Sequence, residues 1–168
     1  MPDPNQDTDV KLARIYPTAT LALLLAATAC GTDSTGPNVP KIEETTFAPS
    51  LGITLSTFTK TASGLYWKDL VVGVGSGATV GKKVSIHYVG SLPDGTQFDA
   101  NGPTATPFSF TIGAGQVIGG FDEGLRGMAV GGKRQLIIPP NLASGSQAVG
   151  PIPANSILVF TIDLVAIQ

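Results

Sequence analysis

Short stretches in which apolar and polar residues alternate run through the second half of the chain, and this alternation is typical of half-buried β-strands. In residues 83–89, Val84, Ile86 and Tyr88 fall on one face of an extended chain, and polar side chains fall on the other. Four more stretches are strand candidates: residues 65–72, 108–112, 136–138 and 157–164. The pattern therefore predicts about five strands.

One stretch has the spacing of a helix. Phe121, Leu125 and Met128 recur at i, i+4 and i+7 and would line one side of it. Two acidic residues suit its first turn, and Gly127 offers an end. A short helix with one apolar side must bury that side against a sheet. We therefore predict an α+β fold in which a curved antiparallel sheet of about five strands wraps around one short α-helix.

Residues 1–29 read as a secretory signal peptide. Residues 18–29 are uncharged and apolar, but such a run is too short to cross a bilayer as a helix, which takes about 20 residues. Basic residues precede the run and small residues follow it, as in signal peptides. The acidic residues near the N-terminus do not fit this pattern. A true translation start at Val10 would remove them, and we treat that start as a hypothesis.

Cys30 follows this run directly, in the order Ala-Thr-Ala-Cys-Gly. The order resembles the lipobox of bacterial lipoproteins, whose cysteine becomes the N-terminus and is acylated. The resemblance implies lipidation of Cys30 and a protein exported to the cell envelope. A lipid anchor would hold it on a membrane that faces the periplasm or the exterior. The alternative is a stray cysteine beyond an ordinary cleavage site.

Residues 30–61 would link this anchor to a folded domain. Residues 31–41 are rich in Gly, Ser, Thr and Pro, a composition that predicts a flexible tether. Residues 42–61 carry too many apolar side chains for a linker, so we expect this N-terminal extension to pack on the domain or on a second copy. A solvated tail is the alternative. We expect the domain itself to span residues 62–168.

Composition excludes several classes of function. One cysteine and one histidine exclude an internal disulfide and a metal centre built from several such residues, so we predict neither a metal nor a cofactor. The net charge is −2 and no cluster of Lys and Arg occurs, so nucleic acid is not an expected partner. Residues 127–134 approach a P-loop, but Arg134 stands where a magnesium-binding Ser or Thr is needed. His87, on the polar face of a strand, is expected to be structural.

Several ordered motifs within residues 62–168 resemble the FKBP-type peptidyl-prolyl cis-trans isomerases. The motifs are KVSIHYVG (83–90), FDAN (98–101), QVIGGFDEGLRGM (116–128) and ILVFTIDL (157–164). The resemblance implies the FKBP-like fold and an enzyme that rotates X-Pro bonds and assists the folding of exported proteins. Proline-containing polypeptides would be its partners. A non-catalytic peptide-binding or chaperone module that uses the same cleft is the alternative.

The resemblance also implies a set of site residues, all but one of them apolar or aromatic. The catalytic residues would be Tyr88, Phe98, Asp99, Phe121 and Phe160. The substrate-binding residues would be Phe108, Val117, Ile118, Ile152 and Ser144. Phe121 would form the floor under the proline ring, and the backbone N–H of Ile118 would bind a substrate carbonyl. Asp99 would orient Tyr88 or interact with the reacting carbonyl.

Three departures from the family pattern bear on binding. Ser144 stands where the family commonly has a tyrosine, whose hydroxyl hydrogen-bonds the ligand, and one such bond contributes about 0.5–1.5 kcal/mol. The loop of residues 146–154 is about one residue shorter than usual and carries Pro151 where a branched apolar residue is common. Thr104 replaces an arginine found in some members. We therefore expect macrolide ligands to bind with reduced affinity.

Overall fold

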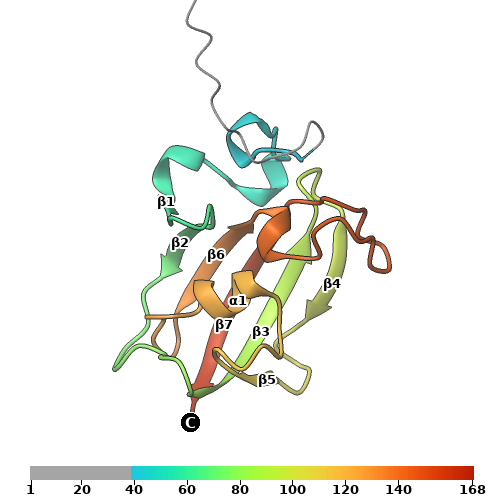
Figure 1. Ribbon diagram of the computed structural model, residues 1–168. Coiled ribbons are helices and arrows are strands. Elements are labelled where there is room, and N and C mark those ends of the chain that lie inside the picture. Colours follow the sequence, from blue (N-terminus) through green and yellow to red (C-terminus); the bar gives the residue numbers. More distant parts are fainter. Residues whose placement is uncertain (1–38) are drawn as a thin grey trace, which may run out of the picture. The chain divides into compact units, whose positions relative to one another are not determined.

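The predicted strands form one antiparallel sheet in the computed structural model, which describes residues 39–168 (Figure 1). The predicted signal peptide (1–29), the lipidation of Cys30 and the first part of the tether lie outside the described residues. The strand order is β1-β2-β6-β7-β3-β4, and β5 also pairs with β3. The strands are β1 (Thr59–Lys60), β2 (Tyr66–Val71), β3 (Lys83–Ser91), β4 (Gln97–Asn101), β5 (Phe108–Thr111), β6 (Lys133–Ile138) and β7 (Leu158–Ile167).

The α+β architecture is confirmed, although the sheet has seven strands where we expected about five. The two additional strands are β1 and β4. β1 has only two residues, too few for a periodic pattern. β4 is an edge strand paired with β3 alone, and most of its residues are exposed, so it lacks the apolar alternation of a half-buried strand.

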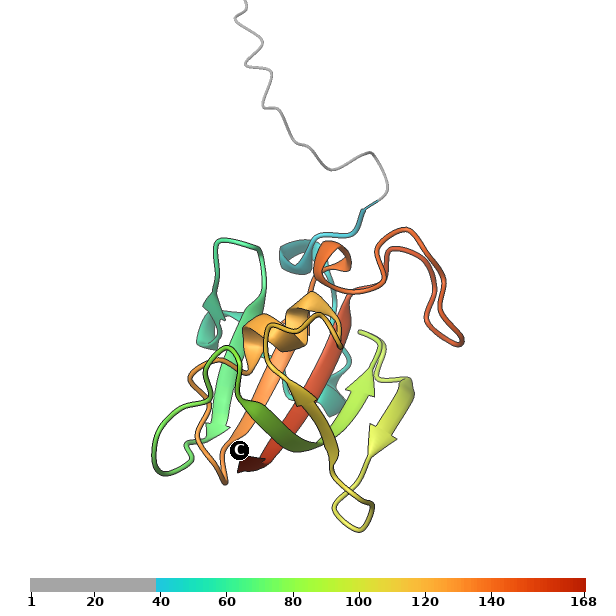
Figure 2. The same cartoon turned by 60° about the horizontal axis from the view of Figure 1, so that its bottom comes forward.

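The helix α1 (Gly119–Gly124) lies on the concave face of the sheet (Figures 1 and 2). It is shorter than the spacing predicted, because the chain leaves the helix at Leu125 and turns at Gly127, whose φ is 76°. Phe121, Leu125 and Met128 are nevertheless all buried, at 5%, 0% and 2% exposure. The predicted apolar side is therefore correct, although a turn carries its second half.

Two glycines let α1 lie close to β6. A Cβ atom on Gly120 would come within 2.5 Å of the Ile138 side chain, and one on Gly124 within 2.5 Å of Leu136. Both distances are far shorter than the 3.5–4.0 Å of carbon atoms in favourable contact. The missing side chains therefore set the separation of helix and sheet, and with it the position of Phe121.

Arg134 joins the sheet to the turn after α1. Its guanidinium, which is buried, donates to both carboxylate oxygens of Asp69 at 2.6 and 3.0 Å. It also donates to the carbonyls of Gly124 and Arg126 at 2.8 and 3.0 Å, and it lies over the Trp67 ring. The residue that ruled out a P-loop thus holds the C-terminal end of α1 on β6.

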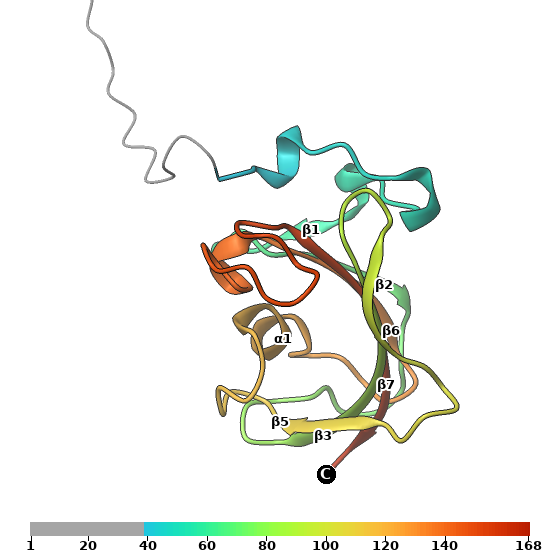
Figure 3. The same cartoon turned by 90° about the vertical axis from the view of Figure 1, so that its right-hand side faces the viewer.

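The N-terminal extension packs on the domain, which is one of the arrangements predicted for it. Its three short 3-10 helices are η1 (Ile42–Glu44), η2 (Pro49–Leu51) and η3 (Leu55–Thr57). Its apolar side chains, the buried Ile42 among them, form a second cluster on the outer face of the sheet together with Tyr66, Ile137, Ile157 and Val159. Figure 3 shows this segment crossing the upper end of the sheet, with its later part beside the β3–β4 turn. The expected boundary at residues 61 and 62 falls between the paired strands β1 and β2.

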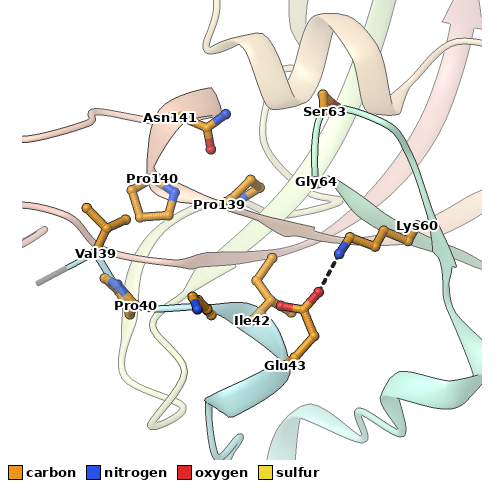
Figure 4. Close-up of a pocket in the computed structure, with 11 residues that line it drawn as sticks. Val39, Pro40, Ile42, Glu43, Lys60, Ser63, Gly64, Pro139, Pro140 and Asn141 are labelled. Atoms are coloured by element: carbon orange, nitrogen blue, oxygen red, sulfur yellow. Dashed lines mark hydrogen bonds and ion pairs between the residues drawn. The ribbon is translucent and has the colours of Figure 1, made fainter. Parts of the chain in front are cut away.

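A small cluster of polar groups fastens the start of this extension. The Glu43 carboxylate accepts a hydrogen bond from Lys60 Nζ (Figure 4) and a second one from the Tyr66 hydroxyl. These bonds, that of Lys60 first, lower the pKa of Glu43 to about 2. A cavity of ≈ 140 Å³ lies beside the cluster, between residues 39–43 and the Pro139-Pro140 pair that precedes and begins η4 (Pro140–Leu142). The carboxylate in this cavity is already engaged, so the cavity offers little for chemistry.

Candidate active site

A second cavity, of ≈ 220 Å³ and open on one side, lies on the concave face of the sheet beside α1. Its lining is apolar and aromatic apart from a single carboxylate. The lining residues are Tyr88, Phe98, Asp99, Phe108, Val117, Ile118, Phe121, Ile152, Leu158 and Phe160. Apolar cavities with a few convergent polar groups are typical of ligand sites, so this is the candidate functional site.

Four strands, one helix and two loops bring these residues together. Strand β3 contributes Tyr88, and β4 contributes Phe98 and Asp99. Strand β5 contributes Phe108, and β7 contributes Phe160. Because side chains alternate along a strand, each of these aromatic residues points to the concave face. The helix α1 contributes Phe121. The loop between η4 and β7, prominent in Figure 2, contributes the side chain of Ile152.

The aromatic rings contact one another mostly edge to face. The Phe121 and Phe160 centroids are 4.7 Å apart, with the planes at 76°. Phe98 meets Phe160 at 5.4 Å and 84°, and Tyr88 meets Phe121 at 6.0 Å and 74°. Phe121 and Phe160 are each 5% exposed, whereas Phe108 is 39% exposed. The first two rings therefore form the base of the cavity and Phe108 forms its rim.

Gly90 makes room for two of these rings. It pairs with Phe160 on β7 and with Asp99 on β4. A Cβ atom at this position would lie 2.6 Å from the Phe160 ring and 2.8 Å from the Phe98 ring. The absence of a side chain here lets the rings of two separate strands meet over β3.

Tyr88 and Asp99 form the one polar pair of the cavity. The Tyr88 hydroxyl donates to Asp99 Oδ2 at 2.8 Å. Burial, and then the bond to Asp99, raise the pKa of Tyr88 to about 12. The phenol therefore stays a neutral hydrogen-bond donor at neutral pH. The carboxylate is held in one orientation at the mouth of an apolar cavity.

The segment before α1 is held in place by Asp122. Its carboxylate accepts from the backbone N–H groups of Gly113 and Gly115, at 2.9 and 3.3 Å. Ile118 ends this segment, and its carbonyl accepts from the N–H groups of Phe121 and Asp122. Within residues 39–168, the N–H of Ile118 donates to no other group. A backbone donor is therefore left at the cavity wall, where the family resemblance places a contact with a substrate carbonyl.

The structure brings together all the predicted site residues except Ser144. That residue follows η4, and it is not part of the cavity lining. Its Oγ is buried and has no hydrogen-bond partner among residues 39–168. A serine side chain is too short to reach where a tyrosine hydroxyl would. Ser144 therefore lies outside the cavity lining, and its contact with a substrate stays a prediction.

Two residues at the cavity were missed by sequence reasoning. Leu158 lies in the predicted strand at residues 157–164, but only the register of β7 brings it to the cavity. Gly90 directly follows the predicted strand at residues 83–89, and nothing in the pattern marks it as a contact between rings. His87 Nδ1 lies 2.9 Å from Asn101 Oδ1, which agrees with the structural role expected for it.

Other kinds of site find little support in this part of the chain. Among residues 39–168, no three His, Cys, Asp or Glu side chains gather closely enough to hold a metal ion. No helix in the same residues is long and apolar enough to cross a membrane.

Comparison with known proteins points to one family. A family profile described as "FKBP-type peptidyl-prolyl cis-trans isomerase" matches residues 75–165. FK506-binding protein 3 of Candida albicans is 50% identical over 105 residues, which are 62% of this chain and 24% of that protein. FK506-binding protein 2 of Dictyostelium discoideum is 52% identical over 89 residues, which are 52% of this chain and 67% of that protein.

A solved structure shares the fold. The crystal structure of AtFKBP13 is 40% identical to the chain, with a TM-score of 0.61, over 66% of this chain and 98% of that one. Several of the curated relatives are much longer, and the chain spans only about a quarter of their length. The similarity therefore concerns one domain of those proteins.

Proposed function

Because the chain belongs to the FKBP-type peptidyl-prolyl cis-trans isomerase family, we propose that it catalyses rotation about X-Pro bonds of polypeptides bound in the aromatic cavity. The observation that carries this proposal is the cavity itself. Aromatic rings enclose a space with one oriented carboxylate and one backbone donor that has no partner within residues 39–168. The only histidine in the sequence, His87, is hydrogen-bonded to Asn101, so few groups at the cavity could transfer a proton.

Isomerisation needs no such chemistry. Amide resonance sets a barrier of about 18–20 kcal/mol to rotation, and an X-Pro bond takes tens to hundreds of seconds to rotate unaided. The catalyst has only to bind the twisted amide more tightly than the planar one. Neither a covalent intermediate nor a cofactor is involved.

The cavity distinguishes the two states by polarity. The planar amide has a strongly polar carbonyl, and twisting weakens the resonance that polarises it. Transfer from water into a ring of Phe98, Phe121 and Phe160 therefore disfavours the planar form more than the twisted form. The same rings grip the apolar pyrrolidine ring, and the 5% exposed Phe121 is its floor.

The polar groups act in the same direction. A planar amide carries more negative charge on its oxygen than a twisted one. A carboxylate facing that oxygen therefore raises the energy of the planar state more, and the bond from Tyr88 holds Asp99 for this task. The N–H of Ile118, which has no acceptor among the described residues, can bind a neighbouring substrate carbonyl and so fix the peptide on both sides of the rotating bond.

The direct test is the cis-to-trans rate of a short X-Pro peptide, measured without a coupled protease. We expect the rate to rise linearly with the concentration of the full chain. A folded chain that gives no acceleration would contradict the proposal. Saturable binding of the same peptide by that inactive chain would then favour the non-catalytic peptide-binding or chaperone role.

We also propose that the protein is exported and anchored in the cell envelope of a bacterium through lipid on Cys30, where it assists the folding of exported proteins. The support is the order of residues 18–30, an apolar run that ends in a lone cysteine followed by a polar tether. Labelling expressing cells with a clickable fatty acid tests this. We expect label on the wild-type chain and none on Cys30→Ser. An unlabelled wild-type chain would overturn the anchor.

Macrolide binding is proposed for the same cavity. Two of the similar proteins are named for binding FK506, which supports such a ligand here. The affinity is expected to be reduced, since Ser144 does not line the cavity. Titration calorimetry with FK506 measures it, and absence of heat at high ligand concentration would contradict the proposal.

A further inference from the structure

The strand that carries Phe98 and Asp99 is weakly supported by the sheet. β4 lies at the edge of the sheet and pairs with β3 alone. Three of its five residues are exposed, and its register with β3 shifts beside Gly90. Two catalytic side chains of the proposed isomerase therefore depend on a strand that needs support from elsewhere.

The far end of β4 has a visible anchor. Asn101 lies 2.9 Å from His87 Nδ1 through its Oδ1, and its Nδ2 donates to the carbonyl of Thr106 at 3.0 Å. The near end begins at the turn of residues 92–96, whose hydrogen bonds are internal to the turn apart from one to the N-terminal extension. The near end adjoins Phe98, so its support decides where that ring lies.

The N-terminal extension supplies this support. The backbone N–H of Ala48 donates to the carbonyl of Pro93 at 2.8 Å. A Cβ atom on Gly95 would lie 2.9 Å from Ser50 Oγ and 3.2 Å from Ala48 Cβ, so extension and turn are in close contact. Figures 1 and 3 show the extension against the tip of the β3–β4 hairpin.

Hollows flank this contact on either side. One is lined by residues of the turn together with Thr45 and Thr46, and the other by Ser50, Gly95 and Gln97 among others. No continuous packed layer therefore lies beside the contact between Ala48 and the turn.

The extension is itself fixed to the middle of the sheet. Gln135 of β6 is 5% exposed, and its Nε2 donates to the carbonyl of Leu51 at 2.9 Å. Leu51 in turn donates through its N–H to the carbonyl of Ala48. A chain of hydrogen bonds thus leads from β6 through η2 to the turn that begins β4.

We propose that Ala48, through its backbone N–H, is a positioning residue that holds the start of β4 and so sets Phe98 and Asp99 in the cavity. This inference rests on the proposed isomerase function for its effect on rate, although the placement of Phe98 can be measured without it. The segment between the membrane tether and the domain is then part of the catalytic scaffold.

The variant Ala48→Pro tests the contact. Ala48 has φ −59°, which proline adopts, but proline lacks the N–H and its ring carbon would occupy the place of the hydrogen bonded to Pro93. Gln135→Met removes the amide that fixes Leu51 and approaches the same contact from the sheet, in case the proline variant does not fold. Glu43→Gln is the matched control, because it loosens the extension near β1 and β2, which carry no site residue.

Each full-length variant is compared with the wild type by isomerisation rate and by the nuclear Overhauser effect between the Phe98 and Phe160 rings. We expect Ala48→Pro to lower kcat/KM about tenfold, as small misplacements do, and to weaken the ring contact. Gln135→Met should act in the same direction, and Glu43→Gln should leave both the rate and the ring contact unchanged.

Two results would overturn the proposal. One is that Ala48→Pro and Gln135→Met fold and keep the wild-type ring contact, and the other is that Glu43→Gln loses as much rate and ring contact as they do. A wild-type chain without activity refutes the isomerase function, and the ring contact still decides the role of Ala48.

Discussion

The rings of Phe121 and Phe160 meet edge to face, with centroids 4.7 Å apart and planes at 76°. One ring comes from α1 and the other from β7, so this contact joins helix and sheet at the base of the cavity. Its geometry depends on Gly120 and Gly124, which let the helix approach β6. This pair of side chains therefore contributes both to the cavity and to the stability of the fold.

Replacing Phe121 by Ala should damage both. The lost apolar floor should lower kcat/KM roughly tenfold or more, and the lost ring contacts, worth about 0.5–1.5 kcal/mol each, should lower stability. The free energy of unfolding should fall by less than the about 3–5 kcal/mol of a fully enclosed ring, because Phe121 borders an open cavity. Phe58→Ala, on the outer face, is the control and should cost stability without loss of rate. Wild-type turnover in Phe121→Ala would refute the floor assignment.

Replacing Asp99 by Asn separates charge from geometry. The amide oxygen can still accept from the Tyr88 hydroxyl, so the pair stays in place while the negative charge is lost. We expect kcat to fall several-fold with KM nearly unchanged, because the charge acts on the difference between planar and twisted amide. Tyr88→Phe keeps the charge and removes its orienting donor. If the Asp99 charge plays no part in catalysis, Asp99→Asn should have the kcat of the wild type.

Acid should weaken the attachment of the extension through Glu43. Its pKa is about 2 in the folded protein, against an ordinary 4.5, so the folded state favours the ionised form. The resulting stability is present above pH 4.5 and is lost as the pH falls towards 2. Glu43→Gln should therefore melt a few degrees below the wild type at neutral pH, and the difference should shrink in this acidic window. A constant difference down to the lower pH would contradict the assignment.

Arg134 and its neighbour Lys133 should differ sharply in their effect on stability. Arg134→Met leaves the half-buried Asp69 carboxylate and two helix-end carbonyls without their donor, and breaking such a buried pair costs about 3–5 kcal/mol. Lys133 pairs with Asp163 on the surface, where a salt bridge contributes about 0–1 kcal/mol. Urea unfolding of Arg134→Met and Lys133→Met measures both. Similar midpoints for the two variants would contradict this account.

Ser144→Tyr should strengthen macrolide binding. The hydroxyl of a tyrosine can extend towards the cavity that Ser144 does not line, and one added hydrogen bond is worth about 0.5–1.5 kcal/mol, up to roughly tenfold in affinity. Titration calorimetry with FK506 compares the two proteins. Ser144→Ala should match the wild type, since the serine Oγ has no partner among the described residues.

Much of the site could be predicted, because apolar alternation and ordered motifs determine which side chains share a face. Tyr88, which shares a predicted face with Val84 and Ile86, lines the cavity for that reason. The exposed edge strand β4 was missed because pairing, and not burial, makes it a strand. Gly90 and the Ala48–Pro93 bond depend on contacts between segments distant in sequence. No periodic pattern in the sequence encodes such contacts. The sequence pattern also does not reveal that Ser144 falls short of the cavity.

The position of β7 in the sheet has a consequence for synthesis of the protein. β7 lies between β6 and β3 and pairs with both along most of its length, yet it is made after each of them. Until it leaves the ribosome, the two halves of the sheet have no strand to join them. Contacts of such long sequence separation make folding slow, so the nascent chain stays unfolded late. A chain in that condition is suited to passage through a translocation channel, which would fit the export proposed for this protein.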